Sequence, residues 1–378
     1  MNTGFPFHLA RPATLLLAAL SLPAAAAPTV YEMRLTTSGG MTAGGLGGMF
    51  GAMMGGGGGS SRSMDLRLTS PADLPASYDA HHVVPETMGI GPKLPLRGER
   101  RSGGRDTPGG DSEQPDGRVL IYWGCSPTVG RGQPEIIDFR AMAGKLPPEV
   151  AALARQSRSQ SKGGAEGASL PPRTIHWPGG DPNFRGLASN ASAVGDHAVN
   201  TNFMKDEIRY KVTPAIDFLD PMNLKARADN LKAAIPLSWD AVPRVRGWDM
   251  QAVAMGSEKE TIIWLADRNK SPMLPGSQRE CTIPEGIFSK SEMAMANGVA
   301  HGPVQGFSYP PQPPGERKIP LIWSATVRVT GHDMAVLGMP AMERGNGRGE
   351  APGTAGEAPT DSLIPPAVGN VLKGIFGK

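Results

Sequence analysis

The stretch from residue 235 to 255, IPLSWDAVPRVRGWDMQAVAM, carries the pattern that decides the fold. Ile235, Leu237 and Trp239 stand at every second position, and apolar side chains at this period are typical of a half-buried strand. A turn is expected over 243–247, because proline fixes φ and glycine accepts a positive φ. The alternation resumes after the turn. The stretch therefore predicts two short strands joined by a turn.

A related stretch, IPLIWSATVRVTGHDMAVLGM, occupies residues 319–339 and matches the first at many positions without a gap. A duplicated supersecondary unit would explain the match. So would the small set of residue types from which strands are built. We favour a strand pattern shared within one sandwich. Because Val327 stands where the first copy has Pro243, the second copy is predicted to form one long strand over 321–330.

The order of strand, Pro/Gly turn and strand in LSWDAVPRVRGWDMQAVA resembles the early strands of fibronectin type III and immunoglobulin-like sandwiches. The resemblance covers about residues 214–266. It implies a β-sandwich with Trp239 as its core tryptophan, in a protein that recognises or spaces other molecules. The fold alone does not determine the function.

The composition predicts compact β-rich regions separated by irregular segments. The chain has 378 residues, of which 50 are glycine and 37 are proline, and only 19% are charged. Such a share of glycine and proline is close to that of low-complexity segments. The formal net charge is +3, and no run of lysine and arginine is interleaved with aromatic residues. The sequence therefore predicts no nucleic-acid partner.

The N-terminal residues have the three parts of a secretory signal peptide. Arg11 precedes an apolar run over 13–22, and small residues follow at 24–27. Cleavage is expected after Ala26. No cysteine lies near the cleavage region, so the mature protein is not expected to be a lipoprotein. The predicted location is periplasmic or secreted.

We expect a mainly β protein with antiparallel β-sandwich regions and long Gly/Pro-rich loops. The first region is a strand pair, over 30–36 and 64–69, because both segments alternate and share the letters RL. The predicted organisation is a signal peptide over 1–26, an N-terminal strand pair over 27–96 with a Gly/Met-rich loop over 38–63, a linker over 97–117, a β-rich region over 118–212, a fibronectin III-like β region over 213–340, a linker over 341–361 and a tail over 362–378.

Further strands are predicted from runs of β-branched and aromatic residues between turn residues. The segment 118–125 is the most apolar of them and is expected to be central in its region. One short helix is predicted near 148–155, with proline and glutamate in its first turn. The remaining predicted strands are 136–139, 174–177, 197–202, 207–212, 260–266, 280–284 and 306–309.

The Gly/Met-rich loop allows three interpretations. A flexible connection between paired strands is favoured, because glycine weakens both helices and strands. A helix that packs closely through its glycines in lipid is the second. The third is a Cu(I) site, because thioethers are soft ligands, formed by the methionines of the loop. These methionines are Met41, Met49, Met53 and Met54.

The histidines show no metal-ligand spacing. His81 and His82 are adjacent, so in an extended segment they point to opposite faces, and one is expected to pack while the other is solvated. The other histidines are scattered singly and are expected to be structural or solvated. They include His176, His197, His301 and His332.

No catalytic, cofactor-binding or metal-binding motif is present, and we expect no catalytic residue, cofactor or metal. The favoured function is a binding or structural role in the cell envelope for an exported β-sandwich protein that is not an enzyme. One alternative is a membrane-associated envelope factor that uses the Gly/Met-rich loop and the C-terminal tail. The other is a hydrolase assembled from residues distant in sequence.

The chain has two cysteines, Cys125 and Cys281, in apolar predicted strands of an exported protein. A disulfide between them is one expectation, because exported proteins meet an oxidising environment. Two buried free thiols are the other, because free cysteine behaves as a small hydrophobic residue.

The C-terminal tail has the apolar spacing of an amphipathic helix. Its expected contacts are the protein's own core, a groove on a partner protein or another envelope surface, or peripheral contact with a membrane. The residues that would dock are Val368, Val371, Leu372, Ile375 and Phe376.

Overall fold

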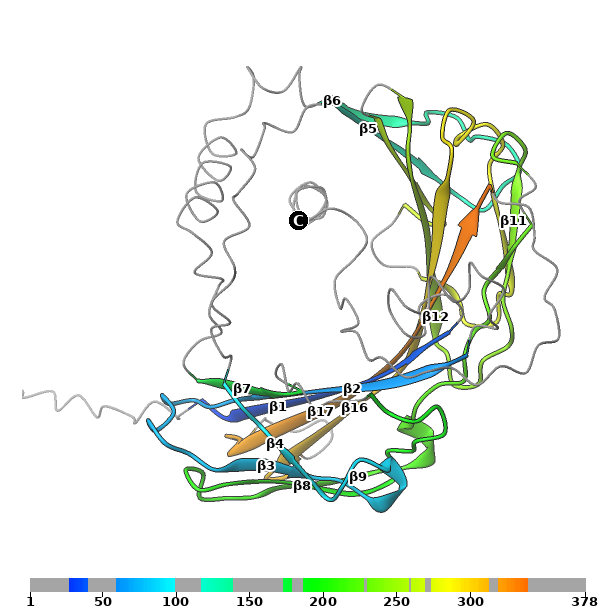
Figure 1. Ribbon diagram of the computed structural model, residues 1–378. Helices are drawn as coiled ribbons and strands as arrows, with labels where there is room; N and C mark the ends of the chain where they lie inside the picture. Colours follow the sequence, from blue (N-terminus) through cyan, green and yellow to red (C-terminus); the bar gives the residue numbers. More distant parts are fainter. Residues whose placement is uncertain are drawn as a thin grey trace, which may run out of the picture.

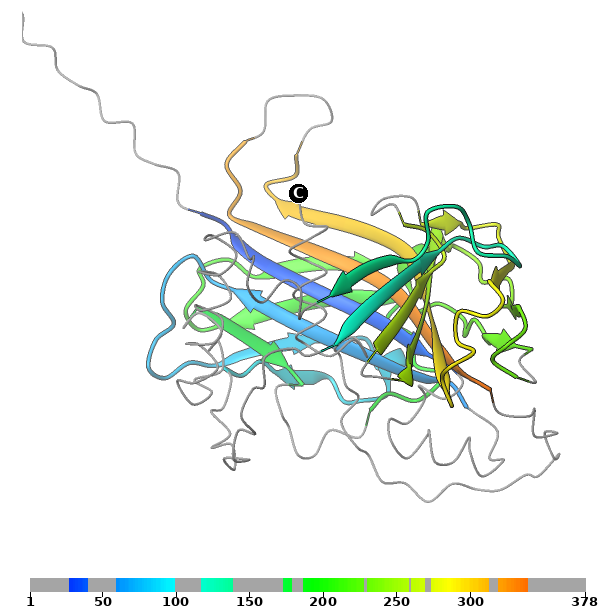
Figure 2. The same ribbon diagram turned by 90° about the horizontal axis from the view of Figure 1, so that it is seen from above.

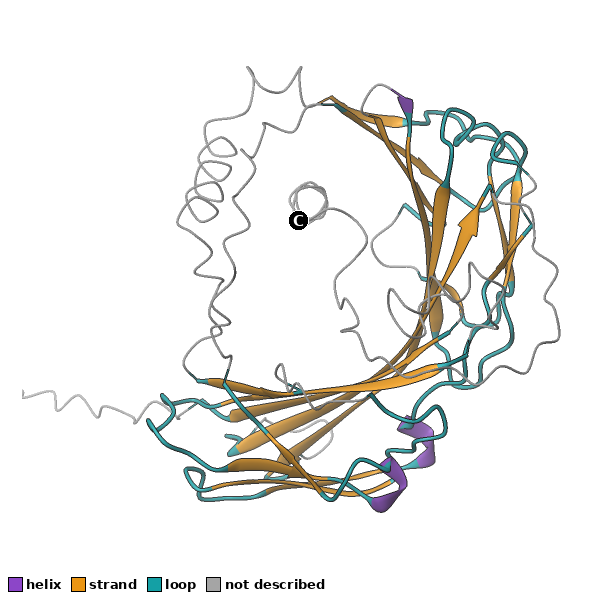
Figure 3. Cartoon of the chain, viewed as in Figure 1, coloured by secondary structure: helices purple, strands orange, loops and turns teal. Residues whose placement is uncertain are grey.

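The computed structural model shows a mainly β chain with largely antiparallel sheets, as expected from the sequence (Figure 3). The predicted signal peptide, most of the Gly/Met-rich loop, the helix near 148–155 and the C-terminal tail lie outside the described residues. The structure describes residues 27–39, 59–98, 117–138, 173–178, 186–227, 230–257, 260–268, 273–312 and 319–338.

The strands match most of the segments predicted from the sequence. Two short 3-10 helices, η2 (Glu86–Met88) and η3 (Pro214–Ile216), lie between them. The strands are β1 (Thr29–Ser38), β2 (Ser61–Thr69), β3 (Ala80–Val83), β4 (Lys93–Pro95), β5 (Arg118–Trp123), β6 (Glu135–Asp138), β7 (Thr174–Trp177), β8 (Gly195–Thr201), β9 (Ile208–Val212), β10 (Lys225–Ala226), β11 (Ile235–Ser238), β12 (Gly247–Met255), β13 (Glu260–Leu265), β14 (Leu274–Pro275), β15 (Glu280–Ile283), β16 (Ala294–Tyr309) and β17 (Trp323–Leu337).

One large sheet runs through the whole molecule (Figure 2). Its strand order is β6-β5-β13-β12-β16-β17-β1-β2-β7, and β14 pairs with β12. The pairs β1–β17 and β5–β13 are parallel, while the other pairs are antiparallel. Strands from the predicted regions 27–96, 118–212 and 213–340 therefore share one sheet. The expected pair of β1 and β2 is confirmed.

Two smaller sheets pack against one face of the large sheet, which bends strongly between them (Figure 1). The sheet β4-β3-β8-β9 lies against β1, β2, β16 and β17. The sheet β10-β11-β15 lies against the part that contains β12. We call the face that carries both small sheets the outer face of the large sheet, and the opposite, concave face the inner face.

The main hydrophobic core lies between the outer face and the two small sheets. On β1, Tyr31, Met33 and Leu35 are fully buried, and the residues between them are more exposed. On β12, Trp248 and Met250 are buried in the same way. This alternation is what a strand with one covered face requires.

The two related stretches form different structures. The second is the single long strand β17, as its valine in place of proline predicted. The first is divided between β11 and β12, which belong to different sheets. Trp239, just after β11, is 4% exposed and packs against Trp248 with 5.6 Å between ring centroids. The turn between the two strands thus carries the chain from one layer to the other.

One expectation about position in the sheet is wrong. The apolar segment 118–125 was expected to be central, but β5 lies second from an edge, between β6 and β13. Its apolar character has another cause. Val119 and Ile121 are buried in a second hydrophobic cluster on the inner face, together with Ile137 and Ile263. An apolar run of this kind marks a strand with little solvent on either face, and it does not show how many strands lie beside it.

The strand predicted over 306–309 is only the last part of β16, so the sequence analysis underestimated the length of this strand. The missed part is rich in alanine and glycine, which are poor strand formers. A Cβ at Gly298 would lie 2.7 Å from the Met222 methyl group, and one at Gly302 would lie 2.9 Å from the Val329 carbonyl oxygen. Small residues are therefore needed here so that neighbouring groups can pack directly on the sheet.

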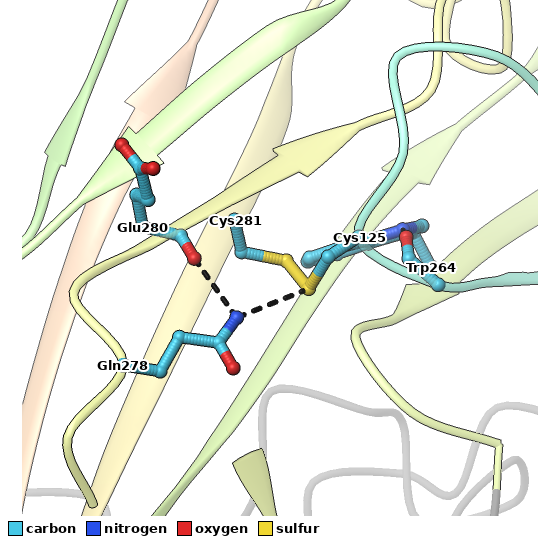
Figure 4. Close-up of a disulfide and its surroundings, with 6 residues drawn as sticks. Cys125, Trp264, Gln278, Glu280 and Cys281 are labelled. Carbon is cyan, nitrogen blue, oxygen red and sulfur yellow. Dashed lines mark hydrogen bonds between the residues drawn. A yellow bond between two sulfur atoms is a disulfide. The ribbon is translucent and has the colours of Figure 1, made fainter. Parts of the chain in front are cut away.

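A disulfide joins two layers (Figure 4). Cys125 follows β5 of the large sheet, Cys281 lies in β15 of the three-stranded sheet, and their sulfurs are bonded with a Cα–Cα distance of 4.9 Å. The Gln278 side-chain amide donates to the Glu280 carbonyl oxygen at 2.9 Å and lies 3.8 Å from the Cys125 sulfur. Nearby, the indole N–H of Trp264 donates to the Gly124 carbonyl oxygen at 3.0 Å.

The two tryptophans should respond differently to substitution. Trp239→Ala is expected to lower the free energy of unfolding by roughly 3–5 kcal/mol, because it removes a buried ring and leaves a cavity. Trp239→Phe should lower the free energy of unfolding by less than Trp264→Phe does. The Trp239 indole nitrogen has no hydrogen-bond partner among the described residues, whereas Trp264→Phe would leave the Gly124 carbonyl unpaired. Urea denaturation measures all three, and an unchanged midpoint for Trp239→Ala would contradict the core assignment.

Candidate functional site

Side chains that could bind a ligand gather on the inner face of the large sheet. Cross-strand partners point to the same face, so the register shows which residues share it. On β12, β16 and β17 the inner-face residues form successive cross-strand rows. Val253 lies opposite Met295, Gln251 opposite Asn297, and Asp249 opposite Val299.

A pocket of about 560 Å³ lies at one end of these rows. It is formed where β12 ends and β16 begins, together with the residues just before β16. Its lining is Gln251, Val253, Ala254, Met255, Gly256, Ser257, Thr261, Lys290, Glu292, Met293, Met295 and Asn297.

Three methionines dominate the apolar part of the pocket. Met255 is 62% exposed and Met293 is 46% exposed, so neither belongs to the core. The pairing of Ala254 with Ala294 places Met255 and Met293 opposite each other at the end of the ladder. Met295 is one row further along. Methionine is flexible and polarisable, which suits a surface that adapts to an apolar ligand.

The next rows along the sheet are polar. Gln251 and Asn297 contribute amide groups to the pocket. Beyond them, the His301 imidazole Nε2 lies 2.6 Å from an Asp249 carboxylate oxygen. Burial and, to a lesser extent, the nearby His301 lower the pKa of His332. The methionine side of the pocket also includes Lys290 and Glu292, and the row of imidazoles and a carboxylate lies beyond the amides along the sheet.

The His301–Asp249 pair has no nucleophile beside it among the described residues. Thr330 is the cross-strand partner of His301, but its hydroxyl hydrogen-bonds the Thr36 hydroxyl at 3.2 Å. Within the described ranges, no hydroxyl or thiol is hydrogen-bonded to His301. A nucleophile activated by a base requires that contact.

The second hydrophobic cluster adjoins the pocket through Val253, which contacts both. At its edge, the Arg268 guanidinium stacks over the Trp123 ring at 4.4 Å from the centroid. The same guanidinium donates to Glu135 at 2.7 Å. This stack links β5, β6 and the segment that follows β13.

No family model and no curated protein matches this chain. The inner-face geometry is therefore the basis for any functional conclusion.

The described residues hold no group of three histidine, cysteine, aspartate or glutamate side chains placed to bind a metal ion. The methionines proposed for Cu(I) in the Gly/Met-rich loop lie outside the described residues. Among the described helices, none is long and apolar enough to cross a membrane.

The buried histidines belong to the core on the outer face. His82 is fully buried, whereas the His81 side chain is 22% exposed, as expected for adjacent residues in a strand. The Tyr31 hydroxyl lies 2.8 Å from His82 Nδ1, and His82 Nε2 lies 2.9 Å from His197 Nδ1. His197 Nε2 lies 2.7 Å from the Ala193 carbonyl oxygen.

The donors and acceptors in this series of hydrogen bonds follow from the Ala193 carbonyl at its end. The Ala193 carbonyl can only accept, so His197 Nε2 carries a proton and its Nδ1 accepts from His82 Nε2. His82 Nδ1 is then bare and accepts from the Tyr31 hydroxyl. Burial lowers the pKa of His82 well below its usual value, and His197 adds to that effect. Burial also lowers the pKa of His197. Both rings are neutral parts of the core, remote from the inner face.

The sequence analysis selected none of the residues that line the pocket as site residues. It singled out the two cysteines, which the structure brings together on the outer side, and the tail residues, which lie outside the described residues. It missed the methionines of the pocket. The alternating segment Met293-Ala-Met295 was the available signal, but a strand was not expected there because alanine and glycine follow.

Proposed function

We propose that this chain is an exported binding protein of the cell envelope, whose inner-face pocket holds the apolar part of a small ligand. The observation that carries the proposal is the pocket at the end of β12, which is lined by the exposed Met255 and Met293 together with Met295. Binding sites for small molecules are typically apolar concavities of a few hundred Å³ with a few polar groups. Export, the cell-envelope location and a fibronectin III-like sandwich are part of the same proposal.

The lining indicates the chemistry of the ligand. Its apolar part would contact Met255, Met293 and Met295. A polar part would lie toward the amides of Gln251 and Asn297, which can both donate and accept hydrogen bonds. This arrangement fits an amphiphile better than a sugar or a free ion.

A second candidate function, peripheral contact with a membrane, is favoured by a different surface. The β16–β17 hairpin ends in exposed apolar side chains: Tyr309 is 47% exposed, Ile319 is 40% exposed and Ile322 is 47% exposed. Exposed apolar groups of this kind are found where proteins meet partners or lipid.

The pocket proposal is tested with N-phenyl-1-naphthylamine, a neutral apolar dye that fluoresces when it is bound. The wild-type protein is expected to bind the dye. The variant Met255→Gln/Met293→Gln should bind it roughly tenfold more weakly, because apolar contact is lost while side-chain size is kept. Both residues are largely exposed, so the urea midpoint should stay unchanged.

Met273→Gln is the matched control, because Met273 is 41% exposed but lies beside Gly247 at the other end of β12. It should leave dye binding unchanged. Equal binding by the wild-type protein and the double variant would contradict the proposal.

A further inference from the structure

Two arginines face each other on the inner face, away from the pocket. Arg34 of β1 and Arg328 of β17 are direct partners in the parallel pair of these strands. Their side chains therefore lie side by side on the same face. Both arginines are exposed. Two like charges directly opposite each other on neighbouring strands repel, so the pair does not stabilise the sheet.

The carboxylates around this pair contact Arg34 and leave Arg328 without an ion pair among the described residues. Arg328 has Val304 as its partner on the other side, and it forms no ion pair with any described residue. The Arg34 guanidinium lies 3.9 Å from a Glu32 carboxylate oxygen, and an exposed ion pair of this kind contributes little to stability. Asp65 is the other cross-strand partner of Arg34, and burial raises the pKa of Asp65 by more than the nearby Arg34 lowers it.

Hydroxyl groups occupy the next inner-face row. Thr36 and Thr330 are direct partners two residues further along β1 and β17, and their hydroxyl oxygens lie 3.2 Å apart. Arginine offers a planar fork of donors that matches the oxygens of phosphate and carboxylate groups. Two guanidinium groups with hydroxyls beside them thus present donors to one oxyanion.

We propose that Arg34 and Arg328 form a binding site for an oxyanion, with a phosphate group as the best fit. An oxyanion between them would replace the repulsion of two like charges with charge-assisted hydrogen bonds. This site is distinct from the methionine pocket. Val336, the partner of Met295, is eight residues further along β17 than Arg328, which is about 26 Å along a strand. The proposal therefore goes beyond the pocket and does not depend on it.

The test follows the arginine Nε–H signals by NMR while the full-length protein is titrated with inorganic phosphate at constant ionic strength. The signals of Arg34 and Arg328 are expected to shift together. Arg328→Gln and Arg34→Gln should each weaken phosphate binding roughly tenfold, because each removes charged donors. Arg209→Gln on β9, an exposed arginine of the small sheet, is the control and should bind phosphate as the wild type does.

Urea denaturation distinguishes a binding role of the two arginines from a structural role. Arg328→Gln should leave the urea midpoint unchanged or raise it, because it removes like-charge repulsion. A lower midpoint with unchanged phosphate binding would overturn the proposal. Dye binding in the methionine pocket should not change in this variant, so failure of one site can be distinguished from failure of the other.

Vesicles identify the source of the oxyanion. Sedimentation with phosphatidylglycerol vesicles, compared with phosphatidylcholine vesicles, shows whether a lipid headgroup occupies the site. Binding to the anionic vesicles that is lost in Arg328→Gln would support the proposal with a lipid as ligand. Binding of inorganic phosphate alone would support it with a soluble ligand. No arginine-dependent binding of either would overturn it.

Discussion

As the pH falls below 6.5, the protein is expected to lose unfolding free energy, by up to about 1.4 kcal/mol per pH unit for each of two buried histidines. His82 and His197 are 0% and 1% exposed, and burial lowers the pKa of both. The unfolded chain, with ordinary histidines near pH 6.5, therefore binds protons that the folded chain does not. Each such proton lowers stability by about 1.4 kcal/mol per pH unit, so stability is retained above pH 6.5 and falls below it.

The hydrogen-bond chain strengthens this expectation. Protonation of either ring would put a second N–H donor opposite a group that already donates to it, so the chain from Tyr31 to Ala193 would break. Burial and the nearby His301 also lower the pKa of His332, which adds an effect of the same sign.

Urea denaturation at several pH values measures the effect. His81→Asn is the control, because His81 is partly exposed and lies outside the chain of buried rings, and it should keep the same pH dependence. A free energy of unfolding that stays constant from pH 7 to pH 5 would contradict the buried neutral state of both histidines.

Removal of the disulfide should also lower the free energy of unfolding by several kcal/mol. Cys125 and Cys281 are 156 residues apart, and closing so long a loop restricts the unfolded chain strongly. The chain-entropy estimate for such a loop is about 5 kcal/mol. Cys125→Ala/Cys281→Ala should therefore lower the free energy of unfolding by about that amount. The same bond joins the large sheet to the three-stranded sheet, so its loss should also loosen the contact between these layers.

Urea denaturation of the oxidised wild type, the reduced wild type and the double variant measures this contribution. The double variant should be insensitive to reductant, which separates loss of the bond from other effects of the reducing agent. Equal midpoints for the oxidised wild type and the double variant would show that the disulfide does not stabilise the fold.

Local patterns were sufficient to predict most strands, because side-chain alternation depends only on which face is buried. The segments around Met33, Leu66 and Ile263 alternate, or are apolar throughout, as their covered faces require. The pair of β1 and β2 was also predictable, since the two strands are close in sequence and share a pattern. The continuity of β17 through Val327 followed from the valine at the position of a proline, although the strand extends to Leu337, beyond the predicted 321–330.

The arrangement of the sheets could not be predicted from such patterns. The parallel pair β1–β17 joins opposite ends of the chain, and no local signal specifies it. β16 was missed because Gly298 and Gly302 are poor strand formers that are needed for close packing. The candidate sites depend on these same pairings: Met255 meets Met293, and Arg34 meets Arg328, only after the strands have been placed beside each other.

Binding of an apolar ligand at the methionine pocket is the central claim, and methionine methyl NMR tests it most directly. With carbon-13 in the methionine methyl groups, each methionine reports its own surroundings while the dye is added. The signals of Met255, Met293 and Met295 are expected to shift with the dye concentration, while those of the buried Met33 and Met64 stay in place. Shifts confined to methionines outside the pocket, or no saturable shift at all, would contradict the claim.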